Sequence, residues 1–153
     1  MQATVSIGHL GFALSVALVA VVAPRTAPAQ SGKWVATITQ LSSIAGAADI
    51  TIEPRNERQS RVKITFRNTR RDMRLAWDIV VGRCGDDGAP IAAQAAFTQV
   101  QTQMDGGGTA TSNVPKLESG KLYYVRVFDP QVAPRDGNAF GCGNLSEKES
   151  DTR

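Results

Sequence analysis

Alternation of apolar and polar residues with a period of two is the feature that most restricts the fold of this chain. In the segment RVKITFR, Val62, Ile64 and Phe66 alternate with charged or hydroxyl side chains. Such a pattern gives a strand one apolar face and one polar face, which is typical of a half-buried β-strand. No long helical period appears after residue 30. The chain is therefore expected to consist mainly of strands.

Five further segments carry strand signals, and several are separated by Gly-rich or Asp-rich turns. They are residues 34–41, 48–53, 74–81, 109–114 and 121–128. The polar connection between 48–53 and 61–67 predicts a hairpin. Residues 89–103 are ambiguous because their Ala and Gln residues favour a helix whereas Pro90 and Thr98 oppose it, and we expect a crossover loop with a short strand or helical turn. Seven or eight short strands predict an all-β fold, an antiparallel sandwich or barrel.

Two of these predicted strands have an apolar face for the core and an opposite face that carries both charged and apolar residues. In 74–81 the predicted core face carries Leu75, Trp77, Ile79 and Val81, and the opposite face carries Asp78 and Val80. In 121–128 one face carries Tyr123, Val125 and Val127, and the other carries Leu122, Tyr124, Arg126 and Phe128. The alternation of Trp77 with Leu75 and Ile79 predicts that its indole lies in the core rather than on a sugar-binding surface.

The first 29 residues are interpreted as a signal peptide. Residues 10–23 form an apolar run that is shorter than the roughly 20 residues of a membrane-spanning helix, and Ala27-Pro28-Ala29 supplies small residues for cleavage. Residues 1–9 depart from the usual pattern because they contain no Lys or Arg. An uncleaved interfacial anchor is the alternative. We expect a secreted or periplasmic protein with one domain over residues 30–153 and no membrane span after cleavage.

Removal of residues 1–29 changes which kinds of chemistry are open to the protein. Residues 30–153 contain 16 basic and 14 acidic side chains, a balance that predicts no nucleic-acid-binding surface. The only histidine of the chain, His9, lies in the predicted leader. Without it, imidazole-ligated zinc, copper or haem sites and catalytic triads with a His base are excluded from the mature chain.

The chain contains two cysteines, Cys84 and Cys142, with 57 residues between them. An oxidising compartment permits them to form a disulfide. A disulfide that closes a loop of this length stabilises the fold by roughly 4 kcal/mol, because it lowers the entropy of the unfolded chain. Two buried free thiols are the alternative.

Four segments resemble, in order, motifs of the secreted bacterial relatives of copper/zinc superoxide dismutase. They are WDIVVGRCG at 77–85, MDGGGTATSNV at 104–114, YVRVF at 124–128 and GCGNL at 141–145. The resemblance implies a superoxide dismutase-like Greek-key β-sandwich of about eight strands. It also implies a disulfide from the loop after the fourth strand to the last strand, through Cys84 and Cys142.

Positions that correspond to copper ligands of that family hold other residues here. They are Asp78, Val80 and Phe128. Redox-active copper is held by imidazole in that family, and Val and Phe offer no lone pair. Ala139 stands where the family has an arginine that guides the substrate. The resemblance therefore implies a pseudoenzyme with no catalytic residues, metal or cofactor.

Two contacts are expected to replace the metal in stabilising this region. If the two strands are neighbours, Asp78 and Arg126 can form an ion pair and Val80 can contact Phe128. Partly exposed cross-strand pairs contribute roughly 0.2–1 kcal/mol each. The alternative is that these residues are unrelated surface positions.

A residual calcium site is a second possibility at these strands. Its oxygen ligands would come from Asp78, Asp86, Asp87 and Asp129, although their spacing fits no calcium loop and Asp86-Asp87-Gly88 has the composition of a turn.

The favoured interpretation is a secreted, metal-free, non-enzymatic β-sandwich with a structural or binding role. One alternative is a metal-binding protein or enzyme that uses carboxylates on the same scaffold. The other is a carbohydrate- or protein-binding domain, and a fold by itself does not choose among these classes. The sequence identifies no partner, although a protein or glycan ligand is compatible with it.

Overall fold

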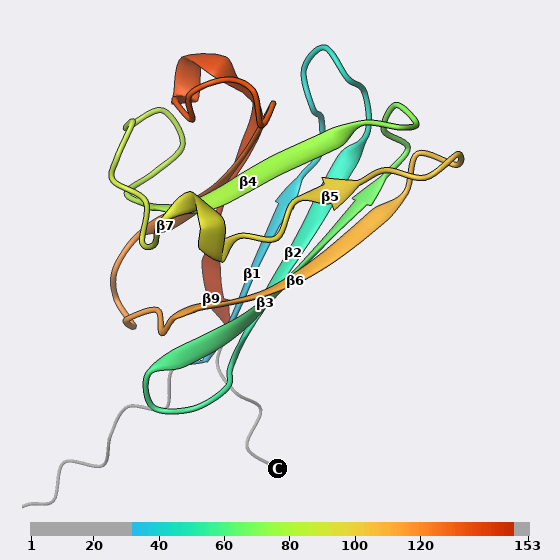
Figure 1. Ribbon diagram of the computed structural model, residues 1–153. Coiled ribbons are helices and arrows are strands. Elements are labelled where there is room, and N and C mark those ends of the chain that lie inside the picture. Colours follow the sequence, from blue (N-terminus) through green and yellow to red (C-terminus); the bar gives the residue numbers. More distant parts are fainter. Residues whose placement is uncertain (1–31, 149–153) are drawn as a thin grey trace, which may run out of the picture.

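Strands make up most of the regular structure in residues 32–148, which are the residues that the computed structural model describes (Figure 1). The predicted signal peptide, residues 1–29, lies outside them. The described elements are β1 (Lys33–Ile38), β2 (Ala47–Pro54), β3 (Gln59–Arg67), β4 (Arg74–Val81), η1 (Gln94–Ala96), β5 (Val100–Gln101), β6 (Gly108–Pro115), β7 (Tyr123–Phe128), η2 (Asp136–Asn138), β8 (Ala139–Asn144) and β9 (Ser146–Lys148).

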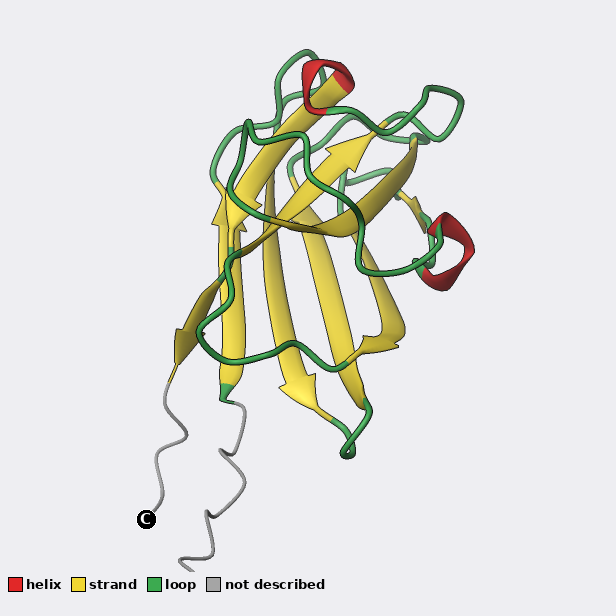
Figure 2. Cartoon of the chain, turned by 90° about the vertical axis from the view of Figure 1, so that its left-hand side faces the viewer, coloured by secondary structure: helices red, strands yellow, loops and turns green. Residues whose placement is uncertain are grey.

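The strands form two antiparallel sheets that pack against each other (Figures 1 and 2). The five-stranded sheet has the order β6-β3-β2-β1-β9, and the four-stranded sheet has the order β5-β4-β7-β8. Three neighbouring pairs, β1–β9, β3–β6 and β4–β7, are not consecutive along the chain, as expected for the long returns of a Greek key. The predicted all-β antiparallel sandwich is confirmed, with nine strands in the described residues.

The hairpin predicted around residues 54–60 joins β2 to β3. Its register pairs Ile50 with Ile64, so the apolar positions of both strands face the same interior. At the turn, Oδ1 of Asn56 accepts the backbone N–H groups of Arg58 and Gln59 at 2.9 and 2.8 Å. An Asn side chain that accepts hydrogen bonds from two backbone N–H groups stabilises the turn locally, without contacts from another strand or loop.

The core lies between the two sheets and contains Trp77, as its alternation predicted. The indole is fully buried, packs edge-on against Phe97 with ring centroids 5.0 Å apart, and donates from Nε1 to the carbonyl of Thr98 at 2.8 Å. Residues 89–103 contain the single turn η1 and the two-residue strand β5, in agreement with the expected crossover. The buried Trp N–H therefore has the partner that its burial requires.

Val81 departs from the prediction that placed it on the core face of its strand. Its side chain is 46% exposed. Val81 is the last residue of β4 and pairs with Tyr123, the first residue of β7, so it stands at the rim of the sheet. A period of two assigns a residue to a face but does not say where the opposing sheet ends.

Burial on both faces distinguishes the two central strands of the four-stranded sheet. Residues 75–80 of β4 and all of β7 are buried, although only alternate residues can face the core. The outer face is covered by segment 82–90, which folds back onto β4 through bonds from Val81 N to Ala89 O at 3.0 Å and from Ile91 N to Ile79 O at 2.9 Å. Segment 129–138, which follows β7, approaches from the other side through Asp136. These two segments create the site described next.

Among residues 32–148, no helix has the length and apolarity needed to cross a membrane.

Candidate functional site

The register of β4 and β7 sets the geometry of the candidate site. Asp78 lies directly opposite Arg126 on the outer face of the sheet, and their side chains are 1% and 2% exposed. Arg126 donates from Nε to Oδ1 of Asp78 at 3.0 Å and from Nη2 to Oδ2 at 2.8 Å. This two-pronged arrangement matches the planar fork of a guanidinium to the two oxygens of a carboxylate, the strongest form of such a pair.

Two further carboxylates approach the same guanidinium from the covering segments. Nη1 of Arg126 donates to Oδ1 of Asp136 at 3.1 Å and to Oδ1 of Asp87 at 3.3 Å. The Asp136 side chain is 15% exposed and that of Asp87 is 59% exposed. We call Arg126, Asp78, Asp87, Asp136 and Tyr124 the Arg126 cluster. Its single cation thus binds three acidic side chains that come from β4, segment 82–90 and η2.

Asp136 connects the two covering segments to the sheet. Its Oδ1 also accepts the hydroxyl of Tyr124 at 2.8 Å, and its Oδ2 accepts the backbone N–H of Gly85 at 2.6 Å. Its own backbone N–H donates to Oδ1 of Asp87 at 3.3 Å. One carboxylate therefore fixes η2 both to the buried face of β7 and to segment 82–90.

The disulfide Cys84–Cys142 forms a second attachment of segment 82–90, and its presence confirms the predicted pairing over two free thiols. The two Cα atoms are 5.8 Å apart, and Cys142 lies opposite Arg126 in the β7–β8 register. The backbone N–H of Cys84 donates to Oδ1 of Asn144 at 2.9 Å. Segment 82–90 is therefore tied to β8 by a covalent bond and to β7 by ionic contacts.

Burial and charge act on the titration of the cluster in different directions. Burial raises the pKa of Asp78 although the hydrogen bonds and charge of Arg126 oppose the rise. For Asp136 burial also acts to raise the pKa, but hydrogen bonds from Tyr124, Gly85 and Arg126 outweigh it and lower the pKa. Burial, followed by the bond to Asp136, raises the pKa of Tyr124 to about 12. The cluster therefore holds a neutral tyrosine and an ionised Asp136 at neutral pH.

The structure corrects the expectation that the Asp78–Arg126 pair is partly exposed. Both side chains are almost completely buried, because segments 82–90 and 129–138 cover them. The small contribution expected for an exposed pair does not apply to such a contact. A buried pair carries a large desolvation cost, and removal of one partner leaves an uncompensated charge.

The expected contact between Val80 and Phe128 is wrong. The register pairs Val80 with Tyr124 and Phe128 with Ala76, so the two residues lie on opposite sides of the Asp78–Arg126 pair. In an antiparallel pair of strands, side chains touch when their residues lie opposite each other or at the next position on the same face. Val80 and Phe128 do neither. Val80 and Phe128 are both buried on the outer face, each against a different neighbour.

The other proposed calcium ligands have local structural roles. Oδ2 of Asp86 accepts the backbone N–H of Arg83 at 2.6 Å, and Oδ1 of Asp129 accepts that of Gln131 at 2.9 Å. These are turn-forming contacts of the kind that Asp side chains make with nearby backbone. Within residues 32–148 no group of three His, Cys, Asp or Glu side chains is arranged to hold a metal ion.

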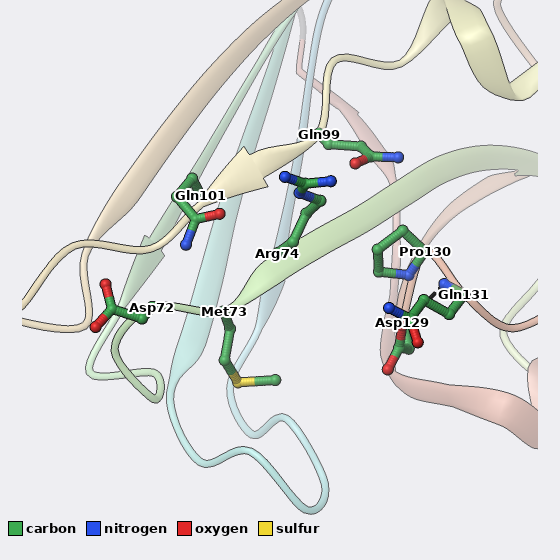
Figure 3. Close-up of a pocket in the computed structure, with 8 residues that line it drawn as sticks. All are labelled: Asp72, Met73, Arg74, Gln99, Gln101, Asp129, Pro130 and Gln131. Atoms are coloured by element: carbon green, nitrogen blue, oxygen red, sulfur yellow. Dashed lines mark hydrogen bonds between the residues drawn. The ribbon is translucent and has the colours of Figure 1, made fainter.

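A surface hollow lies on the same outer face, at the end of β4 away from the disulfide (Figure 3). Its volume is about 630 Å³, and it is lined by Asp72, Met73, Arg74, Gln99, Gln101, Asp129, Pro130 and Gln131. No pattern along the sequence predicts this hollow, because its polar residues lie on three separate segments. Two of these segments come together only through the pairing of β4 with β5.

Comparisons of the chain with protein-family models, curated proteins and solved structures find no match. The resemblance to secreted relatives of copper/zinc superoxide dismutase therefore rests on its four sequence motifs.

We predict that the substitution Asp78→Ala lowers the free energy of unfolding by about 3–5 kcal/mol, because it leaves Arg126 buried without its main partner. Asp49→Ala is the matched control, since it removes an exposed ion pair with Arg67 and should cost at most about 1 kcal/mol. Urea denaturation of both variants measures the difference. Equal losses would contradict the assignment of Asp78 as the principal partner of Arg126.

We predict that reduction of Cys84–Cys142 lowers the melting temperature by about 10 °C or more, because the cross-link closes a long loop in the unfolded chain. Calorimetry with and without reductant measures the shift. A Cys84→Ser/Cys142→Ser variant should melt at the lower temperature with or without reductant. A melting curve that reduction leaves unchanged would count against a stabilising disulfide.

We predict that Tyr124 titrates late, near its pKa of about 12 rather than the ordinary 10. Because the folded state holds this proton more tightly, the resulting stability is present below pH 10 and is lost as the pH rises through the folded pKa. Ultraviolet absorbance of tyrosinate follows the titration. Tyr124→Phe should remove the late step, whereas Tyr123→Phe should leave it, and a late step that persists in Tyr124→Phe would refute the assignment.

Proposed function

We propose that this chain is a secreted, metal-free and non-enzymatic β-sandwich module with a structural or binding role. One observation carries the proposal. At Asp78, where the resemblance to superoxide dismutase relatives implies a copper ligand, the carboxylate is paired on both oxygens with the guanidinium of Arg126.

The chemistry of the Arg126 cluster favours an internal cation over a bound metal. A fixed guanidinium already stands among Asp78, Asp136 and Asp87. Its bonds take both oxygens of Asp78 and one oxygen of each of the other two, which a metal would need as ligands. The other two positions that correspond to ligands hold Val80 and Phe128, whose side chains have no lone pair to donate. The residues present at this place thus suit a structural ion cluster rather than a redox metal.

The placement of the disulfide agrees in part with the resemblance to superoxide dismutase relatives, which implied a bond from the loop after the fourth strand to the last strand. Cys84 follows β4, the fourth strand, whereas Cys142 lies on β8, the last strand but one of the described residues. A disulfide is also a bond typical of oxidising compartments, which agrees with the apolar run and the A-x-A sequence before residue 30.

A carbohydrate- or protein-binding domain is the second candidate, and the hollow in Figure 3 is the observation that favours it. Six of the eight lining residues are polar or charged. Binding and structural roles are compatible, since the Arg126 cluster can support the scaffold while a different part of the same face takes a ligand.

Elemental analysis of purified residues 30–153 tests the proposal. The protein is incubated separately with copper, zinc and calcium salts, desalted and analysed, and its melting temperature is recorded with calcium and with a chelator. We expect less than stoichiometric metal and no shift in melting temperature. Stoichiometric metal would overturn the proposal in favour of a carboxylate-based metal protein.

The variant Arg126→Met sharpens this test. It removes the internal cation and leaves Asp78, Asp87 and Asp136 in place. If the guanidinium is what opposes metal binding, a divalent cation should stabilise this variant more than it stabilises the unmodified protein. Equal stabilisation of both proteins would show that Arg126 does not take the place of a metal.

A further inference from the structure

The outer face of the four-stranded sheet has a covered part and, at one end, an open part. In the covered part, segment 82–90 and η2 contact Arg126. At the open end, Arg74 and Gln101 form a register pair between β4 and β5, and both are exposed. The hollow of about 630 Å³ lies here, and its size falls within the range of small-ligand sites.

Hydrogen-bonding groups that are free to bind a ligand line this hollow. Among the described residues, the side chains of Arg74, Gln99, Gln101 and Gln131 make no hydrogen bond or ion pair with protein groups. In Figure 3 the side chain of Arg74 extends towards Gln99 and Gln101, and Gln131 lies across the hollow. A guanidinium offers several donors, and each carboxamide both donates and accepts.

The rim of the hollow carries charges of both signs, so an ionic ligand meets a like charge as well as an opposite one. Asp72 lies at one end of the hollow and Asp129 at the other, with Arg74 between them (Figure 3). An anion would approach two carboxylates, and a cation would approach the guanidinium. A neutral ligand with many hydroxyl groups avoids both penalties, because a hydroxyl can donate to a carboxylate and accept from a guanidinium or an amide.

The walls of the hollow are held in place before any ligand binds. On one side, the backbone N–H of Met73 donates to Oγ1 of Thr102 at 2.9 Å, and Thr102 N donates to Met73 O at 2.8 Å. On the other side, Asp129 closes its turn through Gln131 N and accepts Val132 N at its carbonyl, at 2.9 and 3.0 Å. A backbone fixed in this way reduces the part of the entropy cost of binding that comes from ordering these segments.

We propose that this hollow binds a neutral saccharide. Arg74, Gln99, Gln101 and Gln131 contact its hydroxyl groups, and Pro130 supplies apolar surface for its C–H groups, whereas the Met73 side chain packs against the core. The proposal rests on the binding role proposed above and names its site and ligand class. Because the hollow contains no aromatic platform and is open to solvent, the expected dissociation constant is on the order of millimolar.

Titration followed by ¹⁵N–¹H NMR tests the proposal on residues 30–153. The probes are the neutral disaccharides cellobiose, maltose, xylobiose and chitobiose, with glucuronate and glucosamine as charged comparisons. We expect at least one neutral sugar to shift the side-chain amide signals of Gln99, Gln101 and Gln131. The charged sugars should shift them less at equal concentration.

Two pairs of matched variants assign the effect to the hollow. Arg74→Met should weaken binding about tenfold, the loss expected for a hydrogen bond to a charged group, whereas Arg61→Met on the other sheet should not change it. Gln101→Ala should also weaken binding, and Gln103→Ala, outside the hollow, should not. All four positions are exposed, so the melting temperatures of the variants should stay close to that of the parent.

Three outcomes would overturn the proposal. They are no shift with any neutral sugar, a preference for glucuronate or glucosamine, and shifts that Arg74→Met leaves unchanged. Each can occur while the protein binds no metal, and bound metal in the elemental analysis would not alter the sugar titration. Failure of the saccharide proposal is therefore distinguishable from failure of the proposed metal-free function.

Discussion

The organisation of this molecule depends on the ion pairs of one buried group, the guanidinium of Arg126. A charge removed from water is tolerated only when other groups replace its hydration. Asp78 provides the first replacement from the adjacent strand, and Asp136 and Asp87 provide the others from segments that would otherwise be free loops. The need to satisfy one cation thus draws three parts of the chain onto one face of one sheet. The disulfide fixes the same arrangement from the side, since Cys142 lies opposite Arg126 in the register.

This arrangement explains why the four-stranded sheet is buried on both faces, whereas a sheet of a simple sandwich is buried only on its inner face. The inner face packs against the other sheet, and most of the outer face is covered, in part by segment 82–90 and η2, so β4 and β7 are buried on both sides. Only the end of the outer face at Arg74, beside β5, stays open. The ion pairs of Arg126 fix the covered part of this face, and the open polar part lies at the other end of β4 on the same sheet.

The alternation of residues predicted most of the strands because the side-chain period is a local property. The hairpin of β2 and β3, the core position of Trp77 and the outer position of Asp78 and Arg126 all follow from it. The disulfide was the only pairing that two cysteines allow, with two free thiols left as the alternative until the structure decided between them. The depth of burial of the Asp78–Arg126 pair did not follow, because it depends on the path of loops whose sequences carry no periodic pattern. The exposure of Val81 did not follow either, because it depends on where the sheet ends.

The sequence by itself determined the all-β class, the face on which residues of the alternating strands lie, and the lack of histidine after residue 30. Only the tertiary structure decided which residues meet across those faces. The β4–β7 register put Arg126 opposite Asp78 and kept Val80 away from Phe128. The paths of segments 82–90 and 129–138 brought Asp87 and Asp136 to the guanidinium. Faces are fixed by neighbours along the chain, whereas register and loop path are fixed by contacts between residues far apart in it, and these contacts exist only in the folded molecule.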